Sequence, residues 1–418
     1  MTSPHRSACC SELADATALT RRGVLRGLGV AGLTYAVGSA VVQASPALAV
    51  AAGERDGTVV VLSLRGAADG LSLVVPHGDP VYAAARPRIA VPTSSLLASD
   101  GFFGLHPELE PLLPYWQAGS FAAVHATGLP APNRSHFSAM EEVEDANPGS
   151  TERIGWLNRL LGDLPGSGTL QGVAVGDETT QIFGPEAHLS FSSLDDAVIA
   201  GDDEWDPTDD RLRSLRRMWG RSKHPLASSV RHAMGAVANL QAAKDVPAGT
   251  AYPDTDLARA LSTVARTIKG DVGARVFTVD QGDWDMHTDL GTLSWGGMRT
   301  NARRLSAALA AFMDDLGDAA SRTTVVVLSE FGRRVKENAN YGLDHGWGNV
   351  MLLLGAGVRG GSYYGTWPGL ANTTDADLTV TTDYRSVLAE VVTTRTSASA
   401  ATVFPGFTPE TVGAMTSL

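Results

Sequence analysis

The chain contains almost no cysteine: of its 418 residues, only Cys9 and Cys10 are cysteines. Both lie in an N-terminal segment that we expect to be removed, so the remaining protein has no disulfide bond and no thiolate ligand. A cysteine nucleophile is excluded for the same reason. Any metal site in the rest of the chain must therefore use imidazole and carboxylate groups.

Positive charge is scarce as well. Lysine and arginine total 33 residues against 45 aspartates and glutamates, which gives a net charge of −12. Residues 1–49 contain four arginines and two acids, so the remainder carries −14. An acidic surface argues against nucleic acid and anionic lipid as partners. Also absent are the Gly-x-Ser-x-Gly elbow, the Gly-x-x-x-x-Gly-Lys phosphate loop and the His-Glu-x-x-His zinc helix.

The first fifty residues have the pattern of an export signal. Arg21 and Arg22 precede a nearly uncharged stretch from Gly27 to Ala44, and Ala47–Ala49 supplies a small-x-small cleavage site. The alternatives are a membrane anchor or a core helix, but the order of these features favours a twin-arginine signal. We expect a mature start near Val50 and a location outside the cytoplasm. No later segment is long and apolar enough to span a membrane.

Short β-branched runs alternate with amphipathic segments through the rest of the chain. The runs expected to be buried strands are 58–64, 121–125, 172–175, 275–279, 323–328 and 350–354. The expected helices are 108–117, 135–144, 226–244, 256–269, 301–316 and 384–394, with Asp254 and Thr255 as N-cap candidates for the fourth. This alternation predicts an α/β fold with a doubly wound, mostly parallel sheet and helices on both faces. We expect a single domain over 50–418 with a polar insertion around 178–222.

Reactive side chains collect just after the predicted strands. Four clusters follow strands, Arg65–Gly70, Asn133–His136, Asp283–His287 and Ser329–Arg333, and a fifth, Asp344–Gly346, comes shortly before the last strand. Ligands of such sheets bind at the carboxyl ends of the strands. The mixture of carboxylate and imidazole favours zinc or manganese over calcium or magnesium.

Five segments carry a resemblance to a known family. Arg65–Leu71, Arg134–Phe137, Trp284–His287, Ser329–Arg333 and Asp344–Asn349 together resemble the exported bacterial family catalogued as domain of unknown function 1501. That family is similar to the alkaline phosphatase and sulfatase superfamily, which has a doubly wound sheet, one or two divalent metals and a nucleophile at a helix N-terminus.

The resemblance implies roles for individual residues. Ser135 occupies the position of the nucleophile at a helix start, with His136 beside it and Arg134 able to neutralise substrate oxygens. The implied metal ligands are Asp69, Asp285, His287, Glu330, Asp344 and His345, for one or two ions. The implied function is hydrolysis of phosphate or sulfate esters in a small molecule or a polymer.

Three departures from the superfamily pattern keep a second hypothesis open. Asp285 and His287 are only two positions apart, Phe331 replaces a histidine, and Trp347 replaces another. These departures favour a site for one metal ion. They also leave open a second hypothesis, a non-catalytic exported protein that binds metal or an envelope component. Pro130 stands where a formylglycine sulfatase needs Cys or Ser, which excludes that enzyme type.

Overall fold

The structure is a computed structural model, and it describes residues 33–37, 40–44, 57–166, 170–176, 179–198, 210–224 and 227–417. The expected arginine pair and the expected cleavage site both lie outside the described residues. Within the expected signal, only two short strands are described, and they extend one edge of the main sheet.

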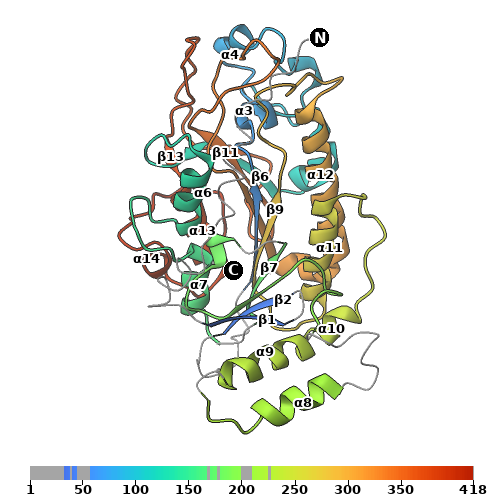
Figure 1. Ribbon diagram of the computed structural model, residues 1–418. Helices are drawn as coiled ribbons and strands as arrows, with labels where there is room; N and C mark the ends of the chain where they lie inside the picture. The colour runs from blue at the N-terminus through green and yellow to red at the C-terminus, as the bar shows by residue number, and fades with distance from the viewer. Residues whose placement is uncertain are drawn as a thin grey trace, which may run out of the picture.

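One large sheet organises the described chain (Figure 1). In spatial order its strands are β1 (Leu33–Val37), β2 (Ala40–Ala44), β8 (His188–Phe191), β7 (Gly172–Val175), β9 (Val276–Gln281), β3 (Thr58–Leu64), β10 (Thr323–Leu328), β11 (Asn349–Gly355), β6 (Phe121–Gly128) and β12 (Tyr363–Tyr364). The short β13 (Thr382–Asp383) also pairs with β6, and β4 (Val74–Val75) pairs with β5 (Gly104–Leu105) in a small second sheet.

Most of the pairings in the main sheet are parallel. The block β8–β7–β9–β3–β10 is parallel throughout, whereas β11 runs antiparallel to both β10 and β6. The central strands are buried on both faces, and consecutive apolar residues fill the middle of β3 and the end of β10. Val59 to Leu62 of β3 are all fully buried, with successive side chains entering opposite cores. Each such side chain contributes about 1.5–3 kcal/mol of burial free energy.

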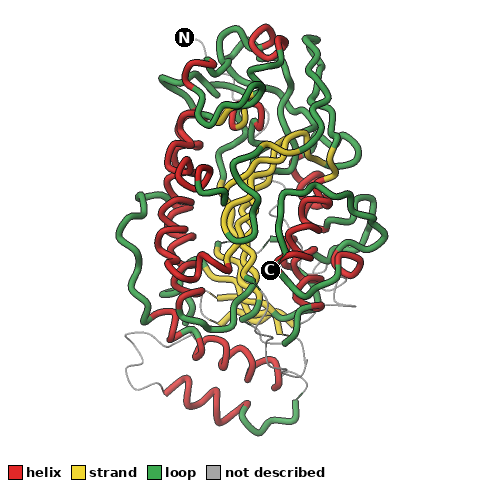
Figure 2. The backbone as a smooth tube through the Cα atoms, turned by 180° about the vertical axis from the view of Figure 1, so that it is seen from behind, coloured by secondary structure: helices red, strands yellow, loops and turns green. Residues whose placement is uncertain are grey.

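Helices cover both faces of this sheet, as the two opposite views show (Figures 1 and 2). One face packs against α6 (His136–Asp145), α7 (Trp156–Asp163), α13 (Tyr384–Arg395) and α14 (Ala400–Val403). The other packs against η3 (Pro107–Leu112), α5 (Leu113–Gln117), α9 (Ala227–Asn239), α10 (Gln241–Lys244), α11 (Asp256–Lys269) and α12 (Gly297–Leu316). The chain is therefore an α/β protein with a doubly wound, mostly parallel sheet.

The remaining elements lie at the two ends of the sheet. The short helices α3 (Gly70–Leu73) and α4 (Pro80–Ala85) lie beyond the carboxyl ends of the parallel strands, while α8 (Asp210–Trp219) packs on α9 at the opposite end (Figure 1). The range 178–222, expected as an insertion, contains both α8 and the sheet strand β8. In the described part of the chain, no helix combines the length and the apolar character that crossing a membrane requires.

Candidate metal centre

The candidate site lies where parallel strands end. Strands β3, β9, β10 and β6 all finish at one edge of the sheet, and the reversed strand β11 begins there. The loops 65–70, 282–296, 329–348 and 129–135 consequently meet at this edge, although they are up to 280 residues apart in the sequence. This arrangement agrees with the position expected for the reactive clusters.

Glycines let these loops approach one another. Gly66 has φ +107°, and a Cβ there would lie 2.5 Å from the backbone nitrogen of Asp285. A Cβ on Gly332 would lie 1.8 Å from the carbonyl oxygen of Gly348. A larger residue at Gly66 would push the loop 65–70 away from the loop that carries Asp285, and one at Gly332 would force apart the two arms of the loop 329–348.

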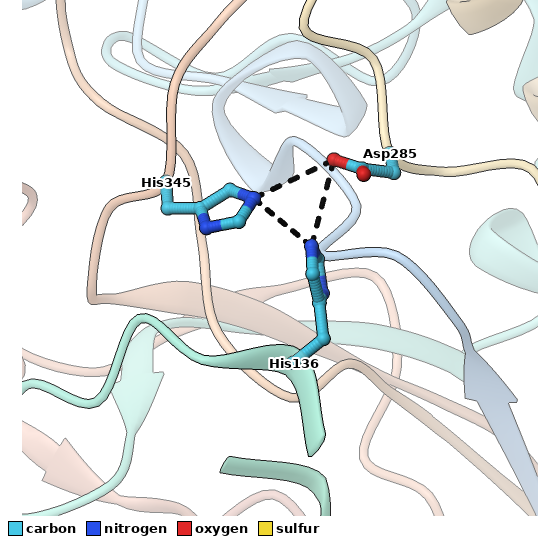
Figure 3. A group of neighbouring side chains, drawn as sticks. All are labelled: His136, Asp285 and His345. Atoms are coloured by element: carbon cyan, nitrogen blue, oxygen red, sulfur yellow. Dashed lines mark hydrogen bonds and ion pairs between the residues drawn. The ribbon is translucent and has the colours of Figure 1, made fainter. Parts of the chain in front are cut away.

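Three imidazole rings converge through their Nε2 atoms. The Nε2 atom of His345 lies 2.9 Å from that of His136 and 2.9 Å from that of His287. His136 starts α6, His287 follows β9, and His345 precedes β11, so three separate segments contribute one ring each. Figure 3 shows His136 and His345 pointing at a common point, with Asp285 closing the group.

Asp285 supplies an oxygen to the same point. Its Oδ1 atom lies 3.5 Å from Nε2 of His136, 3.3 Å from that of His287 and 3.6 Å from that of His345. The buried guanidinium of Arg333 donates to this oxygen at 2.6 Å and also to the carbonyl groups of Gly66 and other loop residues. Arg333 therefore ties Asp285 to the backbone of the β3 loop.

The other nitrogen of each ring faces a hydrogen-bond acceptor. Nδ1 of His136 lies 2.8 Å from Oε1 of Glu330, and Nδ1 of His287 lies 3.1 Å from Oδ1 of Asp344. Nδ1 of His345 lies 2.8 Å from the carbonyl oxygen of Arg134. Because an acceptor needs a donor opposite it, the proton of each neutral ring lies on Nδ1, and Nε2 carries a lone pair. Partners of this kind orient metal-binding histidines in many proteins.

Charge in the site shifts several pKa values. Burial acts to lower the pKa of His136, but the carboxylates of Asp285 and Glu330 outweigh it and raise the value to about 9. Burial acts to raise the pKa of Asp285, yet hydrogen bonds from His136, His345 and Arg333 hold it well below its usual range. The pKa of Glu330 is likewise lowered, mainly by His136 against the opposing effect of burial.

The donor set suits a divalent transition metal. If His136 carries a second proton, its Nε2 atom can donate to Nε2 of His345. Nε2 of His345 and Nε2 of His287 then still face each other without a proton between them, which is repulsive. A cation attracts all these lone pairs at once. Donors around a tetrahedral zinc ion lie about 3.3 Å apart when the bonds are 2.0–2.1 Å, close to the 2.9–3.6 Å of these contacts. His287 meets Asp285 and His345 but lies outside the group in which every ligand atom is within 4.8 Å of every other.

The structure places Asp69 in a different environment. Its Oδ2 and Oδ1 atoms accept from Nη1 and Nη2 of Arg86 at 2.5 and 3.0 Å, and both side chains are buried. Arg86 also donates to the carbonyl oxygens of Arg334 and Val335. Among the described residues, the group whose ligand atoms all lie within 4.8 Å of one another is His136, Asp285 and His345, and it contains neither Asp69 nor His287. Both oxygens of Asp69 are already engaged by a cation.

Ser135 and Arg134 lie at the mouth of the centre. Ser135 is the exposed N-cap residue of α6, and its hydroxyl makes no capping hydrogen bond. Its place directly before His136 puts it at the start of the helix that carries a converging ring. Arg134 holds His345 through its carbonyl oxygen, while its guanidinium is paired with Asp377.

Phe331 packs against two of the candidate ligands. Its buried ring packs 4.9 Å from the ring of His136 and 5.1 Å from that of His345, measured between centroids. An apolar ring on this side of the histidines supplies no further donor. The sequence pattern drew attention to Phe331, but nothing in it indicated the roles of Arg86 or of Asn338, which donates to the carbonyl oxygen of His287.

Some solved structures have a distant similarity to the chain. The C-terminal periplasmic domain of EcEptC from Escherichia coli, in complex with Zn, is 11% identical, with 75% of this chain and 77% of that chain covered and a TM-score of 0.35. The PsFucS1 sulfatase from Pseudoalteromonas sp. is 12% identical, with coverages of 74% and 64% and a TM-score of 0.33.

A protein in the alkaline phosphatase superfamily from Vibrio parahaemolyticus is 13% identical, with coverages of 74% and 63% and a TM-score of 0.30. The chain thus spans slightly less than two thirds of this protein and of the sulfatase. No curated protein matches the chain. A family model described as "Protein of unknown function (DUF1501)" matches residues 115–396, which include the three converging histidines and Asp285. The chain belongs to this family.

Proposed function

We propose that the protein is an exported, metal-dependent hydrolase of phosphate or sulfate esters with a mononuclear centre. The ligands in this proposal are the Nε2 atoms of His136, His287 and His345 and the Oδ1 atom of Asp285. The observation that carries it is that Nε2 of His345 lies 2.9 Å from the Nε2 atoms of both His136 and His287, while the Nδ1 atom of each ring faces an acceptor elsewhere. Glu330 and Asp344 then orient histidines instead of binding the ion, and His136 is a ligand instead of a catalytic group.

The donors favour zinc, with manganese as the second choice. Three imidazoles and one carboxylate, without a thiolate, match the preferences of these ions better than those of calcium or magnesium. When bound, the ion supplies a Lewis acid that polarises the ester oxygens and lowers the pKa of a nearby hydroxyl. The arrangement of the chain around it must provide the rest of the catalysis.

Ser135 is the proposed nucleophile. Its Oγ atom attacks phosphorus or sulfur, the ester alcohol leaves, and water later cleaves the serine ester. The free backbone N–H groups at the start of α6 favour the negative charge of the transferred group. The Arg134 guanidinium, about 39% exposed, adds a positive charge at the entrance.

The proposal includes export of the protein. The arginine pair, apolar stretch and cleavage motif of residues 1–49 support a twin-arginine signal and a mature start near Val50. Because that route carries folded proteins, the centre can be assembled before export. The acidic mature chain fits a small or polymeric ester substrate, without nucleic acid as a partner.

One observation favours a second candidate function. Four protein donors complete a tetrahedral zinc site, whereas catalytic zinc sites keep a position open for water or substrate. A non-catalytic exported protein that holds metal or an envelope component is consistent with such a closed set. The exposure of the Asp285 side chain, 48%, favours the enzyme because an exposed carboxylate can yield its place to substrate.

Metal analysis and turnover of the purified mature protein separate the two candidates. We expect one zinc or manganese ion per chain, and hydrolysis of an aryl phosphate or aryl sulfate that a chelator removes and the ion restores. Ser135→Ala should abolish turnover while the ion is retained. One bound ion without turnover across the ester panel would favour the non-catalytic candidate, and no bound ion would reject the hydrolase and the metal-holding form of the second candidate.

A further inference from the structure

Two arginines beside the candidate centre share one carboxylate. Arg134 is paired with Oδ2 of Asp377 through Nη2, and Arg334 donates to Oδ1 of the same residue at 2.9 Å through Nη1. Arg334 also donates to the carbonyl oxygen of Asp375. Asp377 is largely buried, with 12% of its side chain exposed, so it holds both guanidinium groups in place.

This arginine pair is fixed to the backbone of the centre on both sides. The carbonyl oxygen of Arg134 accepts from Nδ1 of the ligand His345 at 2.8 Å. The backbone N–H of Arg334 donates to the carbonyl oxygen of Asp344, the residue before His345, at 2.9 Å. The backbones of both arginines are therefore joined to the segment that carries His345.

The charges of this group do not cancel. Two guanidinium groups face one carboxylate, so Arg134, Arg334 and Asp377 together carry a formal charge of +1, beside the carboxylates of Asp285 and Asp344. Other arginines of the loops are already engaged: Arg65 pairs with Glu144 and Asp280, and Arg333 is buried against Asp285. The side chains of Arg134 and Arg334 are 39% and 20% exposed, so they can still meet a solute.

From this geometry we infer that Arg134 and Arg334, held by Asp377, form a subsite for a second anionic group of the substrate. The substrate is then an ester with another sulfate, phosphate or carboxylate group near the scissile one. Guanidinium groups recognise such anions through paired hydrogen bonds, and a pre-oriented pair loses little side-chain entropy on binding. In a protein whose net charge is −12, a local cationic site also selects where an anion can approach. This inference rests on the proposed hydrolase.

The kinetic test compares two substrates. One is phenyl phosphate, whose only anionic group is the scissile one, and the other is phenyl phosphate with a sulfonate on the ring. In Arg334→Gln we expect KM for the sulfonated substrate to rise about tenfold more than KM for the plain one. Arg359→Gln is the matched control, because Arg359 is an exposed arginine just after β11, at the opposite edge of the sheet. It should change neither KM. Equal changes for both substrates in Arg334→Gln would overturn the subsite.

A binding measurement keeps the test valid if no substrate is turned over. Calorimetry with benzene-1,3-disulfonate on the metal-loaded mature protein should show binding that weakens about tenfold in Arg334→Gln and hardly at all in Arg359→Gln. Arg334→Lys, which keeps the charge but loses the paired donors, should fall between them. Identical binding by all four proteins would overturn the inference. If benzene-1,3-disulfonate binds in the expected order but no ester is hydrolysed, the proposed hydrolase function is rejected and the anion subsite is retained.

Discussion

Two aspartates at the same edge of the sheet have buried arginines as partners, yet their surroundings differ. Asp69 follows β3, is only 3% exposed, and gives both of its oxygens to Arg86. Asp285 follows β9, has a side chain that is 48% exposed, and gives one oxygen to Arg333 while that same oxygen faces three imidazoles. The comparison indicates that an aspartate after a strand is available as a metal ligand only where the arginine paired with it leaves carboxylate lone pairs free.

The largest effect should come from breaking the buried ion pair of Asp69 and Arg86. Asp69→Asn leaves the charge of Arg86 buried without its counter-charge, which costs about 3–5 kcal/mol. Urea unfolding of the mature protein should show a clear fall in the midpoint. The matched change Asp285→Asn in metal-free protein should cost much less, because water reaches that carboxylate. Equal losses would mean that the two pairs do not differ as the structure indicates.

The next effect concerns metal affinity. A zinc-binding free energy of about 10–16 kcal/mol shared by four ligands means that removing one costs roughly 3 kcal/mol. We expect His345→Ala and Asp285→Ala each to weaken binding by about a hundredfold or more in a competition titration. Asp69→Asn, in its folded fraction, should keep the affinity of the unmodified protein. Retained affinity in His345→Ala would remove that residue from the proposed ligand set.

A smaller loss is expected from the groups behind the ligands. Glu330 holds Nδ1 of His136 and also accepts hydrogen bonds from Ser329 and from the backbone of Gly66. Glu330→Gln should lower metal affinity by about 10- to 100-fold while one ion per chain still binds at saturation. Complete loss of stoichiometric binding would instead identify Glu330 as a ligand.

The most gradual effect is a dependence on pH, at about one factor of ten per pH unit. His136, with its pKa raised to about 9, must lose a proton before Nε2 can bind an ion. Apparent metal affinity should therefore rise about tenfold per pH unit up to about 9 and then level off. In the metal-free protein the protonated ring stabilises the fold fully below pH 6.5, and this contribution is lost as pH rises to about 9. Titrations at pH 7, 8 and 9 test both trends, and a flat affinity profile would contradict them.

Much of the fold follows from local sequence. The runs 58–64, 172–175 and 323–328 form strands with the expected limits, because unbroken β-branched residues suit a sheet buried on both sides. Thr255 caps α11 as expected. Other limits depend on details outside such patterns. Pro111 and Pro114 divide the expected helix 108–117 into η3 and α5, and the short β8 gives no clear signal within a polar region.

The sequence predicted where the site lies in the fold but not which side chains contact one another there. Strand exits indicated where the loops would meet, because parallel strands end at one edge. Sequence alone could not show that Arg86, 17 residues after Asp69, would bond both oxygens of that aspartate. It also could not show which nitrogen of each histidine faces inward. That depends on Glu330, Asp344 and a main-chain carbonyl reaching the rings from distant loops.

The reversed direction of β11 has a consequence for how the protein matures. His345 enters the centre from the start of that strand, while the other rings arrive from the ends of β6 and β9. An ion bound there would join segments on both sides of β3 and β10, and so would fasten five neighbouring strands together. Such an ion cannot be held firmly until β11 has found its place, so retention of metal would report that assembly of the sheet is complete.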